Sequence, residues 1–192
     1  MTVEKVVLQG QRVRLEPLLP GHLPGIAAAI VEGELWRIPV TFVPSPDELA
    51  AFYADAEAAF QARRELTFAT FDDDRIVGST RFRNIELAHR RVEIGFTFLA
   101  PSSQRTHVNT EAKFLMLRHA FEQWQCNRVE LLTDELNTKS RRAIARLGTQ
   151  QEGILRSHMV MRDGRVRDSV MYSLIKSEWP RAKRALEIQL EA

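Results

Sequence analysis

Apolar and polar residues change their spacing along the chain, and each change marks an expected element. Alternation over Arg12–Leu18 predicts a first strand. Helical spacing predicts one helix over His22–Glu32 and another from the start signal at Ser45–Glu48 to about Arg63. The segment between them, Leu35–Pro46, holds three prolines and several apolar side chains, so we expect a loop that covers something. It either closes over the core or forms one wall of a substrate cleft.

The rest of the chain alternates between strand and helix patterns. Asp72-Asp73-Asp74 and Asp163-Gly164 each lie between two apolar runs and predict hairpin turns. These patterns predict strands at Leu66–Phe71, Arg75–Ile85, Val92–Leu99, Arg128–Thr133, Gln151–Met161 and Val166–Ile175, and helices from about Thr110 to Trp124, over Thr138–Leu147 and over Ser177–Leu190. The order indicates an α/β (α+β) protein, and no linker or repeat divides it, so we expect one domain over residues 1–192.

The stretch Arg91–Trp124 carries the most specific pattern. A predicted strand passes into a turn at Pro101–Ser103, a polar loop at Gln104–Asn109 and a long amphipathic helix. The start of a helix presents unpaired backbone N–H groups and the positive end of the helix dipole. Such a connection favours a phosphate or pyrophosphate site. The alternative is an ordinary strand–helix connection.

Charge and composition exclude several classes of protein. The chain has 27 Lys plus Arg against 25 Asp plus Glu, so no strong field attracts nucleic acid. Cys126 is the only cysteine, which excludes an intrachain disulfide. No apolar run approaches the ~20 residues of a membrane span, and the amino-terminal residues do not resemble a signal peptide. We therefore expect a cytoplasmic protein without nucleic-acid or membrane partners. The three adjacent aspartates at 72–74 lack further ligands at useful spacing, so we expect no metal site.

The central stretch resembles the acyl-coenzyme A loop of the GNAT acetyltransferases, and most closely the RimJ/RimL branch of ribosomal-protein N-acetyltransferases. Gln104 follows Pro101 by three residues, as in the family motif Gln/Arg-x-x-Gly-x-Gly/Ala, and Thr110-Glu111-Ala112 matches a RimL-like helix start. His107 and Asn109 replace the two glycines of that motif. The resemblance implies the GNAT fold, a central mixed and mostly antiparallel twisted sheet of about seven strands flanked by helices, with acetyl-CoA as cosubstrate. It places the pyrophosphate on Gln104, Arg105, Thr106, His107, Val108, Asn109 and Thr110.

Glu93 is the candidate general base. It stands eleven residues before Gln104, the offset of the catalytic glutamate in the histone-acetyltransferase members of the superfamily. Strict alternation would put Glu93 on the same strand face as Gly95, Thr97 and Leu99. A salt bridge to a neighbouring arginine is the alternative role for this carboxylate. The resemblance further implies a bulged strand that splays from its neighbour, so that Thr97 and Leu99 bind the pantetheine arm through their backbone.

Asn137 and Ser140 are the candidate groups at the leaving sulfur. Asn is a favoured helix N-cap, so capping alone would explain it. Many GNAT enzymes have a tyrosine seven residues after this Asn, but here that position is Ile144. RimL-like members use a serine three residues after it, and Ser140 stands there.

The resemblance implies transfer of an acetyl group to a primary amine of a small molecule or of a protein or peptide N-terminus. The acceptor would enter over Trp36 and Arg81. A non-catalytic acyl-CoA-binding or sensing module is the alternative, because both glycines of the loop are missing. The sequence leaves open the identity of the amine and whether the protein is a monomer or a homodimer.

Overall fold

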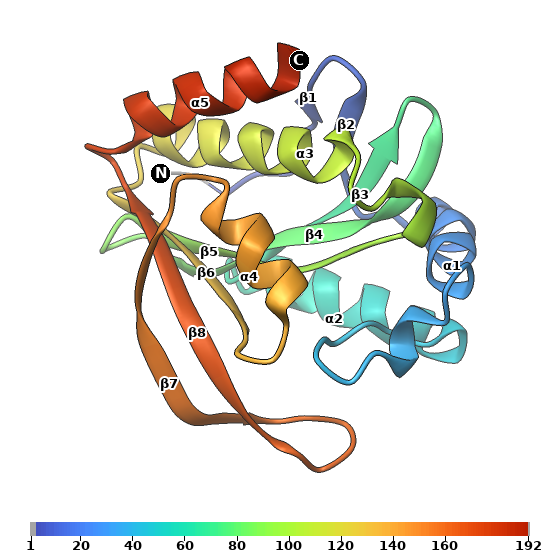
Figure 1. The fold of residues 1–192 in the computed structure, drawn as a ribbon. Helices are drawn as coiled ribbons and strands as arrows, with labels where there is room; N and C mark the ends of the chain where they lie inside the picture. Colours follow the sequence, from blue (N-terminus) through green and yellow to red (C-terminus); the bar gives the residue numbers. More distant parts are fainter. Residues whose placement is uncertain (1–2, 192) are drawn as a thin grey trace.

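The computed structural model describes residues 3–191, so Met1, Thr2 and Ala192 of the predicted domain lie outside it. Within that part of the chain, one sheet has the strand order β1-β2-β3-β4-β5-β6-β8-β7 (Figure 1). All neighbours are antiparallel except β5 and β6, which are parallel. The strands are β1 Leu8–Gln9, β2 Val13–Pro17, β3 Leu66–Asp72, β4 Arg75–Glu86, β5 Arg91–Leu99, β6 Arg128–Asp134, β7 Gln150–Val160 and β8 Val166–Ile175. The one strand beyond the predicted set is β1, which is too short to show an alternation pattern.

Five α-helices cover the sheet, as the order of patterns predicted. They are α1 Leu23–Val31, α2 Leu49–Gln61, α3 His107–Arg118, α4 Thr138–Ala145 and α5 Trp179–Glu191. Helices α3 and α5 lie against one face of the sheet, and α1 and α2 lie against the other (Figure 1). Each face has its own apolar cluster: Phe82, Val92 and Leu115 belong to the cluster under α3, whereas Ile26, Val43 and Phe98 belong to the one under α1 and α2. We call the first the α3 face and the second the α1/α2 face.

The long helix predicted up to Trp124 changes its winding before it ends. The α-helical part stops at Arg118, and His119–Gln123 forms a π-helical turn. The Trp124 N–H donates to the His119 carbonyl at 3.0 Å, which is the i→i+5 pattern of such a turn. The wider turn places Trp124 4.6 Å from the Phe82 ring, centroid to centroid, so the π turn fits a large aromatic side chain to the core.

The β7–β8 hairpin projects from the body of the sheet (Figure 1). Gly164 at its turn has a φ of 82°, which the Asp163-Gly164 signal predicted. The hairpin tip returns to the α1–α2 loop: Arg165 Nη2 donates to the Pro39 carbonyl at 3.2 Å, and Arg162 pairs with Glu48 at 2.9 Å. Two segments far apart in sequence therefore border the same side of the sheet.

Helix length and side-chain clustering give two further findings. No helix within residues 3–191 is both long enough and apolar enough to cross a membrane. Across those same residues, no three His, Cys, Asp or Glu side chains cluster as ligands for a metal ion.

Cys126 is buried, and burial raises the pKa of its thiol to about 11, so the thiol stays protonated at neutral pH.

Candidate active site

The parallel strands β5 and β6 separate part-way along their length. They pair from Arg91 with Arg128 to Glu93 with Glu130, and no further pair between them forms in the described chain, although β5 runs on to Leu99. Beyond Glu93 the facing backbone N–H and C=O groups of β5 and β6 therefore have no strand partner on that side. An extended ligand could supply the missing ladder. The splay implied by the resemblance is present in the structure.

A β-bulge in β5 lies at the same place. Ser79 pairs with Phe98 and Arg81 pairs with Gly95, so the β5 segment has one residue more than the β4 segment opposite it. Phe96 takes up the extra residue with a φ of 47°. This left-handed conformation is uncommon for a bulky side chain, so the surrounding structure must hold it in place.

The bulge reverses which face the side chains of β5 point to. Glu93 lies opposite Arg83 on the α1/α2 face, and a Cβ added to Gly95 would come within 2.9 Å of the Glu93 carboxylate. Thr97 instead contacts Lys113 of α3, and Leu99 packs in the cluster under α3. The prediction that these four residues share one face is therefore wrong for Thr97 and Leu99, because the extra residue at the bulge shifts the alternation by one.

Glu93 is buried, and its contacts fit both of the roles considered from the sequence. Its side chain accepts a 2.6 Å hydrogen bond from Asn84 Nδ2, and Arg83 Nη1 lies 3.7 Å from its other oxygen. Burial raises the pKa of Glu93, and the Arg83 charge and the Asn84 hydrogen bond oppose that shift. The Arg83 contact is thus present, but burial changes the pKa of Glu93 more than this contact does. A carboxylate in such a setting can accept a proton closer to neutral pH than an exposed one.

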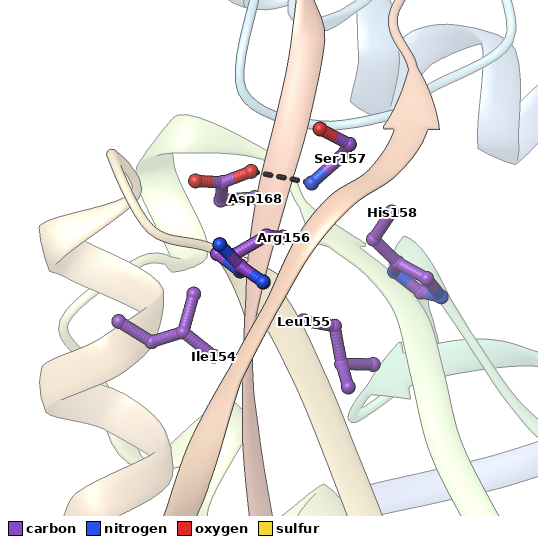
Figure 2. A pocket seen from close by; sticks show the side chains of 6 residues that line it. All are labelled: Ile154, Leu155, Arg156, Ser157, His158 and Asp168. Carbon is purple, nitrogen blue, oxygen red and sulfur yellow. Dashed lines mark hydrogen bonds between the residues drawn. The ribbon is translucent and has the colours of Figure 1, made fainter.

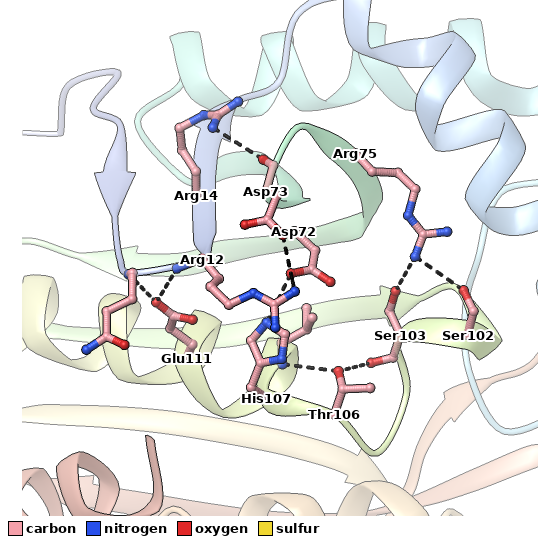
Figure 3. Close-up of polar contacts among 12 residues, drawn as sticks. Arg12, Arg14, Asp72, Asp73, Arg75, Ser102, Ser103, Thr106, His107 and Glu111 are labelled. Carbon is pink, nitrogen blue, oxygen red and sulfur yellow. Dashed lines mark hydrogen bonds and ion pairs between the residues drawn. The ribbon is translucent and has the colours of Figure 1, made fainter. Parts of the chain in front are cut away.

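The start of α3 forms the second half of the site (Figure 3). Thr106 is its N-cap: the hydroxyl accepts from the Val108 N–H at 3.3 Å and donates to the Ser103 carbonyl at 2.8 Å. The helix therefore begins at His107, earlier than the predicted loop Gln104–Asn109 allowed. A capping threonine followed by a polar turn was the signal that would have placed it correctly.

The remaining loop residues have separate roles. Gln104 Nε2 donates to the Leu99 carbonyl at 2.9 Å and ties the loop to the end of β5. Arg105 is exposed and has a φ of 63°, so the left-handed position of this loop precedes the two positions where the family motif has glycine. Val108 is fully buried and offers only its backbone, whereas Asn109 and Thr110 are half-buried in the first turn.

The His107 ring is held to one side of the helix start. Its Nε2 lies 3.0 Å from the Asp72 carboxylate, and Arg12 Nη2 is 3.5 Å from the same carboxylate oxygen (Figure 3). The ring thus contacts the β3–β4 hairpin. The side chain that replaces the first glycine of the family motif therefore has a protein partner of its own.

Asn137 and Ser140 come together at the start of α4. Asn137 Oδ1 accepts from the Ser140 N–H at 3.0 Å, so Asn137 caps the helix. The Ser140 side chain is half-buried, and its hydroxyl makes no hydrogen bond to the described residues. The hydroxyl is therefore free to meet a ligand while the backbone of the same residue completes the cap.

Arg81 and Trp36, the predicted acceptor residues, lie on the α1/α2 face. Arg81 Nη1 donates to Glu65 at 2.7 Å, and its guanidinium lies 4.8 Å from the centroid of the Phe96 ring. Trp36 is half-buried against the apolar cluster of that face. In the same loop Val43 is buried in that cluster, whereas the Phe42 ring stacks on Phe96 at 6.1 Å. The loop Leu35–Pro46 thus covers core residues and also borders the bulge.

Three functional candidates were missed from the sequence. Lys113 lies within the apolar stripe of α3, where its Nζ donates to Thr97 Oγ1 at 2.5 Å and to Thr80 Oγ1 at 3.0 Å. Asp134 at the end of β6 and Arg167 on β8 are buried on the α1/α2 face. A lysine among apolar helix positions was a readable signal. Asp134 and Arg167 gave no such signal, because ordinary strand ends and hairpins also carry charged residues.

Comparisons with known proteins point to one family. Residues 12–150 match the model of the Acetyltransferase (GNAT) domain. YdaF of Bacillus subtilis (strain 168), whose name describes a ribosomal N-acetyltransferase, is 32% identical over 107 residues, which cover 56% of this chain and only 57% of YdaF. A GCN5-related N-acetyltransferase from Brucella melitensis superposes with a TM-score of 0.88 at 33% identity, over 98% of this chain and 86% of that one. RimJ of Mycobacterium smegmatis in complex with CoA-disulfide has the same fold, with a TM-score of 0.81 at 23% identity over 92% of this chain and 88% of RimJ.

Proposed function

Since the chain belongs to the GNAT acetyltransferase family, we propose that it moves an acetyl group from acetyl-CoA to a primary amine by direct attack, without a covalent enzyme intermediate. The observation that carries this proposal is the opening between β5 and β6. It begins beside the buried Glu93 and includes the bulged part of β5, from which the chain runs on to the capped start of α3. A thioester lying in that opening would have a proton acceptor on one side and backbone donors along its length.

The donor's diphosphate would lie at the first turn of α3. The first backbone amides of a helix have no acceptor within it; here the Val108 N–H donates to the Thr106 hydroxyl, and the helix dipole favours an anion beside the neighbouring amides. Arg105, exposed beside this turn, adds a positive charge. The pantetheine arm would pair with backbone near Thr97 and Leu99, where β5 lacks its neighbour.

The transfer needs a proton acceptor and a group that stabilises the departing thiolate. The amine nitrogen attacks the thioester carbon, the carbon–sulfur bond breaks, and the amine proton passes to Glu93, directly or through water. Thiols have an ordinary pKa of about 8.5, so a hydrogen bond from the free Ser140 hydroxyl would stabilise the thiolate that leaves. Both groups can act without a metal ion or a covalent adduct.

The acceptor would approach from the α1/α2 face, between Trp36 and Arg81. The name of YdaF describes a ribosomal N-acetyltransferase, which favours a protein amino terminus as the acceptor, and small amines are the other class. The alternative of a non-catalytic acyl-CoA sensor gains nothing from the comparisons, because the matched family and the named relatives are acetyltransferases.

Two measurements test the proposal. Coenzyme A at 100 times its Kd should stabilise the protein by roughly 2.7 kcal/mol in a thermal shift. Acetyl-CoA with a panel of peptides and amines should release free thiol only when an acceptor is present, and the Glu93→Ala, Ser140→Ala double variant should lose that release. Stabilisation by coenzyme A without transfer to any amine would favour the sensor, and no stabilisation would contradict the proposed donor site.

A further inference from the structure

Arg167 is a buried cation on β8 whose guanidinium is only partly satisfied. The residue is 8% exposed, and its Nε donates to the fully buried Ser169 hydroxyl at 2.8 Å. Ser169 lies opposite Asp134 in the β6–β8 pair, so Arg167 projects from the same face as Asp134. Its guanidinium interacts electrostatically with Asp134, Glu93, Arg165 and Arg83. Arg167 therefore borders the face from which the acceptor would approach.

Three other arginines of this face are each in an ion pair. Arg81 pairs with Glu65, Arg83 with Glu93, and Arg165 with Asp134. Arg167 forms no ion pair with any residue from 3 to 191. Burial lowers its pKa, but a guanidinium stays protonated at neutral pH because its ordinary pKa is above 12. Asp134 and Glu93 attract the Arg167 charge, but among the described residues neither forms an ion pair with it.

The terminal nitrogens of Arg167 are available to a ligand. Nη1 and Nη2 make no hydrogen bond within the described part of the chain, yet neither is among the fully enclosed polar atoms that lack a partner. Both therefore keep some contact with solvent. His158, whose Nδ1 shares the Ser169 hydroxyl with Arg167, lines a hollow of about 890 Å³ on the β7–β8 hairpin (Figure 2).

We propose that Arg167 binds a carboxylate of the acceptor, so that the preferred acceptors are primary amines that carry a carboxylate within a few bonds of the amine. This inference rests on the proposed acetyl transfer. A planar guanidinium with two free nitrogens matches the two oxygens of a carboxylate. A single negative charge balances the single unpaired cation. A dianionic phosphate would exceed it and would be repelled by Asp134 and Glu93.

Such a carboxylate has two sources. A free α-amino acid carries it beside the amine, whereas a peptide supplies it from an acidic side chain close to its amino terminus. Each source has a neutral partner of nearly the same shape: the amino acid amide for the first, and the peptide with Asn in place of Asp at its second residue for the second. Comparing the members of each pair isolates the charge.

The test measures kcat/KM for both pairs with the full-length protein, acetyl-CoA, and the variants Arg167→Met and Arg167→Lys. The wild type should prefer the carboxylate member of at least one pair by roughly 10- to 150-fold, the range of a charge-assisted hydrogen bond. Arg167→Met should abolish that preference through KM and leave the neutral member unchanged. Arg167→Lys keeps the positive charge but lacks the two terminal nitrogens of the planar guanidinium, so it should lose part of the preference. Arg184→Met, at an exposed arginine on α5, is the control and should change neither.

Each outcome decides the proposal. Equal kcat/KM for both members of each pair in the wild type overturns the role of Arg167 and leaves acetyl transfer in place. So does a preference that survives Arg167→Met. No transfer to any amine, including neutral ones, contradicts the proposed function itself and this inference with it. If Arg167→Met does not fold, as shown by loss of the thermal shift with coenzyme A, the partial loss expected of Arg167→Lys decides.

Discussion

Lys113 Nζ lies 2.5 Å from Thr97 Oγ1, so an amine from α3 reaches the bulged part of β5 on the α3 face of the sheet. The Lys113 side chain is buried, its other partner is the Thr80 hydroxyl, and it forms no ion pair with any residue from 3 to 191. Burial lowers the pKa of Lys113 from 10.5 to about 7. The amine is therefore substantially neutral at physiological pH and connects helix to strand through hydroxyl groups alone.

Replacing Lys113 by Met should change how stability depends on pH. In the unfolded chain Lys113 holds its proton up to about pH 10.5, whereas in the folded protein it loses it near pH 7. The unfolded state therefore binds more protons between these values, and wild-type stability rises with pH there. We expect the wild type to gain up to about 1.4 kcal/mol per pH unit relative to Lys113→Met between pH 7 and 10. Urea unfolding at several pH values measures this. Lys139→Met, at an exposed lysine of α4, should give a curve parallel to the wild type.

Glu93→Gln should remove the proton acceptor and keep the shape of the side chain. General-base catalysis contributes roughly 10²- to 10⁴-fold, so kcat should fall within that range. The Kd for coenzyme A should stay near the wild-type value, because Glu93 lies on the acceptor side. Glu86→Gln, at an exposed carboxylate of β4, is the matched control. A Glu93→Gln enzyme with wild-type kcat would exclude this carboxylate as the base.

Asn84→Gly should move the acid limb of the pH–rate profile. Asn84 has a φ of 47°, which glycine adopts freely, so the backbone should be retained. The Asn84 hydrogen bond lowers the pKa of Glu93, and its loss should raise that pKa further. Because the deprotonated carboxylate is the active form, kcat/KM should begin to fall at a higher pH than in the wild type. An unchanged profile would mean that another group titrates in this limb.

Asn137 and Ser140 can be separated by measuring stability and turnover together. Asn137→Ala removes the helix cap and should cost about 1 kcal/mol in urea unfolding. Ser140→Ala keeps the backbone N–H that the cap uses, so its stability should match the wild type. If the hydroxyl stabilises the leaving thiolate, the turnover of Ser140→Ala should fall by roughly 10-fold, the value of one hydrogen bond of about 1.5 kcal/mol. Wild-type turnover in this variant would leave Ser140 with no role beyond its backbone.

Arg105→Gly tests the diphosphate site at the start of α3. The substitution removes the charge while suiting the positive φ of 63° at this position. The Kd for coenzyme A should rise by up to roughly 5-fold, since exposed ion pairs contribute up to about 1 kcal/mol. Arg63→Gly is a closely matched control, because Arg63 is also exposed, has a φ of 55° and follows α2, away from the loop. Equal Kd values for the two variants would place the diphosphate elsewhere.

Local patterns in the sequence determined most of the elements. The strand predicted at Leu66–Phe71 lies within β3, and the Asp163-Gly164 signal marks the hairpin turn. Asn137 caps α4 as its residue type predicted. These features depend on contacts between residues close together in the chain, so residue type and spacing are sufficient to predict them.

The tertiary structure alone decided how the site is arranged. The residue with positive φ in the bulge is Phe96 and not a glycine, and the bulge reverses the faces of Thr97 and Leu99 relative to Glu93. The separation of β5 from β6, the unpaired charge of Arg167 and the buried amine of Lys113 each depend on segments far apart in sequence. Strand register and the balance of buried charges both depend on residues that are distant in sequence and that folding brings together. The pattern of a single segment therefore cannot contain them, because the energy that fixes them comes from non-local pairing and burial.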